Sequence, residues 1–161
     1  MIRILLVVFA AATLAGCATT PNPLSADLRG GMFIQNVDVG WSAQETARKT
    51  NDKNEANKHD MQARLQSTVA TAFKDSPSGA QAVTFKIEIT RYYPGSTIKA
   101  DVSVVRPSDG QVLGVYKDVT GMHAQSGGLL GAIVEVAMKL DYVGILSNSF
   151  AANLRARFNG A

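Results

Sequence analysis

Three consecutive segments near the middle of the chain alternate apolar and polar residues, and this pattern limits the possible folds more than any other feature. The segments cover residues 83–90, 98–104 and 111–119. Alternation at period two is typical of a strand with one buried face. Turn-forming residues separate the segments at 93–96 and 107–110, where proline and glycine occur together. The pattern therefore predicts an antiparallel meander of three strands that is apolar on one side.

The apolar positions of these strands define the face that we expect to be buried. They are Val83, Phe85, Ile87 and Ile89, then Ile98, Ala100, Val102 and Val104, and finally Leu113, Val115 and Val119. An earlier segment, 32–41, alternates in the same way and predicts a further strand. Its expected apolar face carries Phe33, Val37, Val39 and Trp41.

Helical patterns on either side of the meander supply the layer that would cover this face. Asp52 followed by Glu55 fits a helix start of the capping-box type, and apolar residues recur at helical spacing up to residue 73. Pro77 predicts that this helix ends near Asp75. A second helical region covers 132–157, with a break near Asp141. The order β-α-β-β-β-α predicts an α+β fold, in which helices pack on one face of an antiparallel sheet of about four strands.

The first seventeen residues form a separate unit. Arg3 precedes an apolar run over residues 4–12, which is too short to span a bilayer because a spanning helix needs about 20 apolar residues. The run ends in Leu14-Ala15-Gly16-Cys17, and Cys17 is the one cysteine in the sequence. This segment resembles a bacterial lipoprotein signal peptide with its lipobox. The residues alone leave open an ordinary secretory signal cut after Ala18, or a buried structural cysteine.

The lipobox resemblance implies a division of the chain. Residues 1–16 would be a signal peptide, 17–31 a lipidated Cys17 with a flexible tether of about 20 Å reach, and 32–161 a single domain facing the periplasm. The resemblance implies that lipid occupies the thiol of Cys17 and anchors the protein in the membrane. Ala18 stands where lipoproteins retained at the inner membrane carry aspartate, so the resemblance favours the outer membrane over the inner membrane.

Little in the sequence suggests catalysis, a cofactor or a metal. The two histidines, His59 and His123, are far apart and have no metal-ligand spacing, so we expect both to be solvent-exposed. The glycines of 127–131 lack the rest of a nucleotide motif. Asp38, Glu88 and Asp101 could bring carboxylates together, but the lysines between them favour solvent-facing ion pairs. The formal charge of +3 is spread along the chain, which argues against nucleic-acid binding.

Two features are candidates for contact with a partner. Tyr92 and Tyr93 precede Pro94 at a predicted hairpin tip, where exposed aromatic residues would favour an interface, although one tyrosine could instead close the core. The sheet edges are a second route, through strand addition. The apolar segment 127–140 is expected to be a core helix, with a position against lipid as the alternative.

From Val83 to Gly128 the chain resembles small bacterial envelope lipoproteins, including auxiliary lipoproteins of ABC-type transport. The resemblance implies a non-catalytic, membrane-anchored protein that binds an envelope protein partner during assembly or transport. It transfers no functional residue except Cys17. The alternatives are a lipid or small-molecule carrier with a pocket between the sheet and the C-terminal helices, and, more remotely, a cell-wall enzyme.

Overall fold

A computed structural model describes residues 21–48, 52–75, 77–123 and 140–160. Cys17, the predicted signal peptide and most of the apolar segment 127–140 lie outside the described residues. Among the helices within these ranges, none has the length and hydropathy needed to cross a bilayer.

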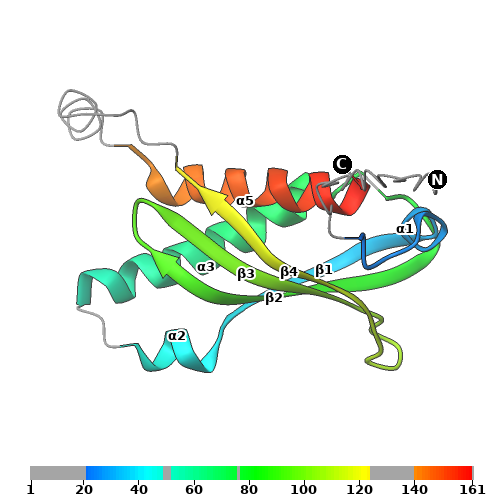
Figure 1. Ribbon diagram of the computed structural model, residues 1–161, viewed down its shortest axis with the longest axis horizontal. Helices are drawn as coiled ribbons and strands as arrows, with labels where there is room; N and C mark the ends of the chain where they lie inside the picture. Colours follow the sequence, from blue (N-terminus) through cyan, green and yellow to red (C-terminus); the bar gives the residue numbers. More distant parts are fainter. Residues whose placement is uncertain (1–20, 49–51, 76, 124–139, 161) are drawn as a thin grey trace, which may run out of the picture.

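Four strands form one sheet in the order of the sequence (Figure 1). They are β1 (Met32–Trp41), β2 (Gln81–Tyr93), β3 (Thr97–Val105) and β4 (Val112–Met122). The β1 and β2 strands are parallel, whereas β2, β3 and β4 pair antiparallel. The predicted meander and the α+β class are confirmed. The last strand runs three residues beyond the predicted end at Val119.

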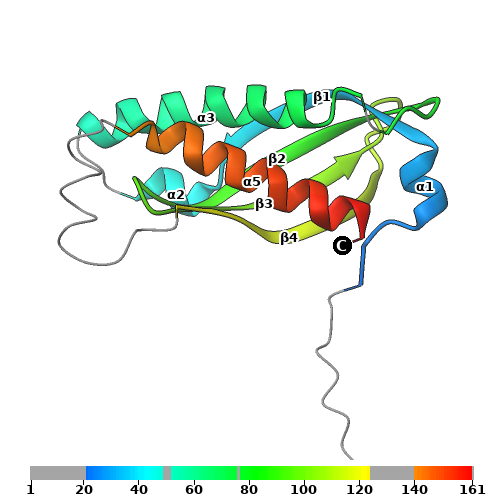
Figure 2. The ribbon, with the colours of Figure 1, turned by 90° about the horizontal axis from the view of Figure 1, so that it is seen from above.

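Two long helices cover one face of this sheet, and within the described ranges neither lies on the other face, which we call the open face. Helix α3 (Asp52–Ala72) lies in the crossover between β1 and β2, and α5 (Tyr142–Asn159) follows β4. Figure 2 shows the two helices side by side over the strands, with α3 packed on β1 and α5 packed on β4. Asp141, where a break was predicted, is the N-cap of α5, and its side chain accepts from the Gly144 N–H at 2.8 Å.

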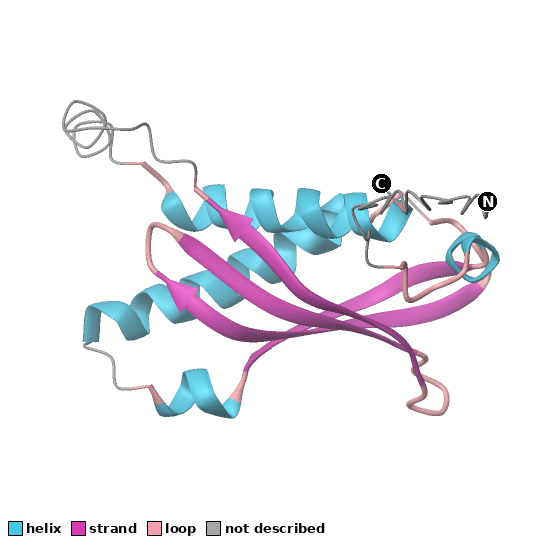
Figure 3. Ribbon diagram, viewed as in Figure 1, coloured by secondary structure: helices cyan, strands magenta, loops and turns pink. Residues whose placement is uncertain are grey.

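Two short helices were not predicted, namely α1 (Ala26–Gly30) and α2 (Ala43–Ala47), which Figure 3 places at opposite ends of the sheet. A serine caps each of them. The Ser25 side chain accepts from the Leu28 N–H and the Ser42 side chain from the Glu45 N–H. Both helices are a single turn, so their apolar periodicity is too short to be detected in the sequence.

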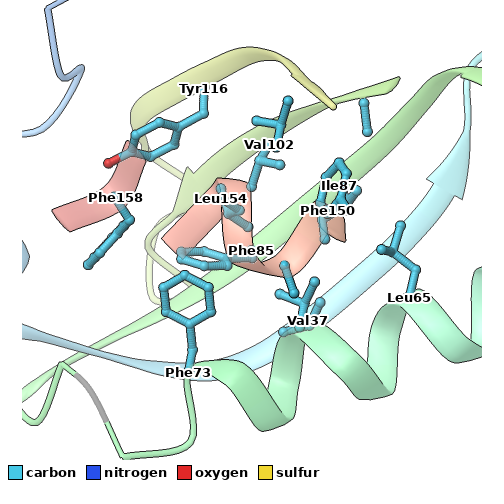
Figure 4. Packing of buried hydrophobic residues seen from close by; sticks show 14 of the residues in the cluster. Val37, Leu65, Phe73, Phe85, Ile87, Val102, Tyr116, Phe150, Leu154 and Phe158 are labelled. Carbon is cyan, nitrogen blue, oxygen red and sulfur yellow. The ribbon is translucent and has the colours of Figure 1, made fainter. Parts of the chain in front are cut away.

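The layer between the sheet and the helices is filled by interlocking side chains (Figure 4). Phe73 directly after α3, Phe85 from β2 and Phe158 from α5 meet at ring-centroid distances of 5.0 to 5.9 Å. Tyr116 from β4 lies 6.2 Å from Phe158. The buried aliphatic residues predicted for β2 and β3 extend this core along the sheet.

Irregular pairing reverses the predicted orientation of two side chains. The register of β1 against β2 shifts between Ile34 and Asn36, which makes Gln35 an extra residue. Phe33 therefore lies on the open face, opposite to Val37. In β4 the register shifts around Asp118, whose φ of 50° is left-handed, so Tyr116 faces the core with Val119 and Val115 does not. The predicted faces were wrong for Phe33 and Val115 because a bulge changes the period-two pattern.

Residues 22–31, which the sequence assigned to a flexible tether, pack against the domain. The Asn22 side chain donates to the carbonyl oxygens of Arg157 at 2.7 Å and Phe158 at 3.2 Å. Leu24 is buried in the core and lies against Gly114, where a Cβ would come within 2.8 Å of its side chain. Asn22 and Leu24 therefore contribute contacts to the folded domain although they precede Met32.

The domain is elongated, and different elements form its two ends (Figures 1 and 2). The proximal end, where the described chain starts, holds α1, the end of α5 and the β3–β4 turn. The distal end holds α2 and the β2–β3 turn at Tyr93–Ser96. Gly95 has φ +77° and allows that turn to close, with Ser96 N–H donating to the Tyr93 carbonyl at 3.0 Å.

Candidate interaction surface

The middle of the open sheet face carries charged side chains, and one ion pair forms among them. Asp38 lies opposite Lys86 in the pairing of β1 with β2, and Glu88 lies opposite Asp101 in the pairing of β2 with β3. Lys117 Nζ contacts the Asp101 carboxylate at 2.6 Å. This face therefore holds both arrangements that the sequence left open, namely the lysine–carboxylate ion pair that it favoured and two carboxylates, Glu88 and Asp101, at paired positions.

Asp101 is the most constrained of these carboxylates. It also accepts from the Asp118 N–H at 2.9 Å. Partial burial raises the pKa of Asp101, but the hydrogen bonds from Lys117 and from the Asp118 N–H outweigh it, so the pKa falls below its usual range. Asp101 is held as a carboxylate, and the hydrogen bond to it raises the pKa of Lys117.

Two shallow hollows lie on the surface of the described part of the molecule. One, of about 560 Å³, crosses the open face between Asp38, Lys86, Glu88 and Val112. Gly40 also lines this hollow, and a Cβ added at Gly40 would meet no atom within 4 Å. The second, of about 410 Å³, runs between β1 and the α3 residues Ala63 to Ala70.

The distal end contains two buried charged side chains, Glu45 of α2 and Lys58 of α3. Only 5% of Glu45 and 7% of Lys58 is exposed. The Lys58 ammonium donates to the Glu45 carbonyl at 3.3 Å and lies 5.5 Å from the centre of the Trp41 ring. Burial of charge is costly unless hydrogen bonds compensate, so this pair fixes α2 and α3 against the end of β1.

Trp41 packs against Lys58 of this pair. Its indole N–H donates to Gln62 Oε1 at 3.1 Å, and Gln62 in turn donates to the Val39 carbonyl at 2.8 Å. The ring of Trp41 lies 5.8 Å from that of Tyr92. Burial raises the pKa of Tyr92 to about 12, and the negative charge of Asp60 acts in the same direction. Tyr92 therefore closes the distal end of the core as a neutral phenol.

Arg48 connects this buried cluster to the surface. Its guanidinium donates to Glu45 Oε1 at 3.4 Å and to the Tyr92 carbonyl at 3.3 Å. It also lies 4.9 Å from the centre of the Tyr93 ring. Tyr93 is 42% exposed. Of the two alternatives for the tyrosine pair, Tyr92 belongs to the core and Tyr93 to the surface.

Tyr93 lies at one end of a row of side chains across the sheet. It pairs with Thr97 of β3, and Thr97 pairs with Met122 of β4. Met122 is 61% exposed. Paired residues of adjacent strands point to the same face, so Tyr93, Thr97 and Met122 share the open face, with Arg48 over the Tyr93 ring. We call these four residues the distal patch.

The histidines do not form a site with one another. His59 is exposed on α3, as expected, whereas His123 is half-buried and packs edge-on against Tyr142 at 5.5 Å, so its expected exposure was wrong. Within the described ranges, no three histidine, cysteine or acidic side chains are grouped as metal ligands.

The sequence reading missed Glu45, Arg48 and Lys58. One signal was available, because Ser42 followed by Glu45 matches the start of a helix. That signal would have identified α2. Nothing in the spacing showed that Glu45 would be buried beside Lys58, because the contact depends on how α2 folds back.

Comparison with known proteins gives distant similarities only. No family model matches the chain, and no curated protein matches it. Two solved structures of PelC dodecamers from Paraburkholderia phytofirmans, one of them a single-residue variant, share 17% and 12% sequence identity with it. They cover 81% and 84% of this chain and 95% and 92% of their own, each with a TM-score of 0.32. Scores this low do not place the chain in a family.

Proposed function

We propose that this protein is a non-catalytic accessory lipoprotein of the bacterial envelope, anchored through lipid on Cys17, that binds a protein partner through its distal patch. The anchor is proposed from the Leu14-Ala15-Gly16-Cys17 sequence after a short apolar run. Ala18 supports the outer membrane as the anchored membrane, with the domain in the periplasm.

One observation carries the proposed binding role, namely the Arg48 guanidinium held over the exposed ring of Tyr93. Tyrosine and arginine are enriched among the residues that contribute most to protein interfaces. Binding costs less when such side chains are already ordered in the free protein. Here the buried carboxylate of Glu45 and the Tyr92 carbonyl hold Arg48 in place before any partner arrives.

The Asp101 carboxylate supports a non-catalytic role. A general acid or base needs a pKa near the working pH. Asp101 has its pKa shifted in the opposite direction and is bound by Lys117. The proposal therefore assigns these charges to the surface of the sheet and not to a reaction.

Photo-crosslinking in intact cells tests the distal patch. A photoreactive phenylalanine in place of Tyr93 is expected to form an adduct with one defined envelope protein. The matched control is the same group in place of Phe33, which is 37% exposed on the same face at the other end. Arg48→Ala should lower the yield of the Tyr93 adduct about tenfold, as expected for a residue central to an interface. Equal protein adducts from both positions, or none from Tyr93, would contradict the proposal.

Metabolic labelling tests the anchor separately. Cys17→Ser is expected to abolish incorporation of palmitate and to release the protein from the membrane fraction. Cys17 is the one thiol of the chain, so the variant has no alternative site for a thioether. Palmitate labelling of the variant equal to that of the original chain would refute lipidation at Cys17.

A further inference from the structure

The large apolar side chains that are exposed in the described ranges divide between the two ends of the domain. Tyr93 and Met122 belong to the distal patch. Leu28, Phe33 and Val112 belong to α1, the start of β1 and the start of β4, all at the proximal end. We call these three residues the proximal patch. The middle of the open face between the two ends carries charged residues, among them Glu88, Asp101 and Lys117.

The point at which the chain leaves the domain is fixed at the proximal end. Asn22 Oδ1 accepts from the Leu24 N–H at 3.0 Å and from the Tyr116 hydroxyl at 2.9 Å, while its Nδ2 donates to the last turn of α5. Arg29 of α1 donates to the Phe158 carbonyl and secures the same turn. These contacts hold Asn22 against α5 and β4, so the chain toward Cys17 starts at a defined position.

The covalent distance from that position to the proposed anchor is short. Asn22 follows Cys17 by 22 − 17 = 5 residues, and five residues span at most about 18 Å in any conformation. Helix α5 has 18 residues and is about 27 Å long at 1.5 Å per residue. A lipid on Cys17 is therefore tied to the proximal end by a chain that is shorter than the domain.

We infer that the proximal patch lies against the bilayer that holds the lipid of Cys17, so that the domain stands with its distal patch turned away from the membrane. The inference rests on the lipid anchor of the proposed function. Apolar side chains at the end nearest the anchor can enter the interfacial region of the bilayer, which adds to the attachment provided by acyl chains. The orientation also leaves Arg48 and Tyr93 open to a partner in the periplasm.

Fluorescence quenching in vesicles tests this orientation with two positions on one strand. Val112 and Met122 are the first and last residues of β4, and they are 53% and 61% exposed. The full lipidated protein, carrying Val112→Cys or Met122→Cys with a fluorophore on the added thiol, is reconstituted into vesicles of phosphatidylethanolamine and phosphatidylglycerol. Nitroxide-labelled lipid should quench the fluorophore at position 112 and leave position 122 unquenched.

A second variant tests whether the apolar contact itself sets the orientation. Phe33→Asp combined with Leu28→Asp should reduce quenching at position 112, while the protein stays on the vesicles through Cys17. Both side chains are exposed, so the fold is expected to survive, and circular dichroism checks this. The matched control, Met122→Asp, should leave quenching at position 112 unchanged.

The outcomes separate the orientation from the anchor. Equal quenching at both positions, or stronger quenching at position 122, overturns the orientation and leaves the anchor standing. A protein adduct from a photoreactive group at position 112 in cells would also overturn it, because a protein would then cover the patch. Loss of the protein from washed vesicles overturns the anchor, and the orientation with it.

Discussion

At the proximal end a neutral side chain, Asn22, ties the start of the described chain to α5 and β4. At the distal end, by contrast, two charged side chains are buried, Glu45 of α2 and Lys58 of α3. Both ends are closed by an aromatic residue that is almost fully buried, Tyr116 at one end and Tyr92 at the other. A neutral amide can satisfy the end of a helix at low cost, but buried charge is expensive to keep.

The two ends differ in what their buried polar groups hold in place. The hydrogen bonds of Asn22 serve groups that already belong to the fold, namely carbonyls at the end of α5. Those of Glu45 and Tyr92 reach Arg48 and hold it beside an exposed aromatic ring. The distal end therefore retains a costly arrangement that orders the surface, which supports the proposed binding role.

The largest expected effect would show whether the proximal end is part of the fold. Leu24→Ala should lower the free energy of unfolding by about 3 kcal/mol, since it removes a buried side chain and leaves a cavity. Urea unfolding measures the change. The matched control is Leu28→Ala in the adjoining helix, where exposure predicts a change within about 0.5 kcal/mol. Similar small effects for both would mean that residues 22–31 are a tether after all.

A smaller change in unfolding free energy is expected when hydrogen bonds are removed at either end, and its size compares the two ends. Asn22→Ala removes four hydrogen bonds and should cost about 2 kcal/mol of unfolding free energy. Gln62→Ala at the distal end removes two and should cost about 1 kcal/mol. A larger loss for Gln62→Ala would reverse the comparison and make the distal network the main constraint.

The smallest effect appears only in alkaline solution. Burial raises the pKa of Tyr116 to about 12, against the charges of Arg29 and Arg157 and the hydrogen bond to Asn22, and burial raises that of Tyr92 to the same value. A raised pKa means that the folded protein keeps protons that the unfolded chain releases. The stability that these phenols contribute is therefore complete below pH 10 and is lost as the pH rises toward about 12.

Denaturant titrations at several alkaline pH values measure this loss. Tyr116→Phe and Tyr92→Phe should each make the unfolding free energy fall less steeply between pH 10 and about 12. If only one of the two variants changes the slope, the other tyrosine is already open to solvent, and its end of the domain is less well closed than the structure shows.

The sequence predicted the strands well because their alternation covers many residues and one face is deeply buried. It predicted the start of α3 from Asp52 and the turns from Gly95 and Gly110 for the same kind of local reason. It placed Phe33 and Val115 on the wrong face, since a single extra residue in a strand changes every later side chain. Local composition does not reveal such a bulge.

The candidate site was less accessible to sequence reasoning. Tyr93 could be found because aromatic residues beside Pro94 stand out at a turn. Arg48 and Glu45 could not, since both lie in a polar stretch whose fold depends on Trp41 and Lys58, one before and one after it in the chain. The packing of Asn22 was hidden for a similar reason, as its partners lie 135 and 136 residues away.

The bulge at Gln35 also bears on how copies of the chain behave when crowded. The β1 strand is at the edge of the sheet, and a regular edge can template a strand from a neighbouring molecule. The proposed anchor would confine these molecules to a membrane surface, where they would meet one another more often than in bulk solution. A regular exposed edge would then favour the growth of fibrils. The extra residue interrupts the ladder, and the adjacent Asn36 amide binds the Asp38 carboxylate at 2.6 Å. The irregular ladder therefore makes this edge a poorer template than a regular strand would be.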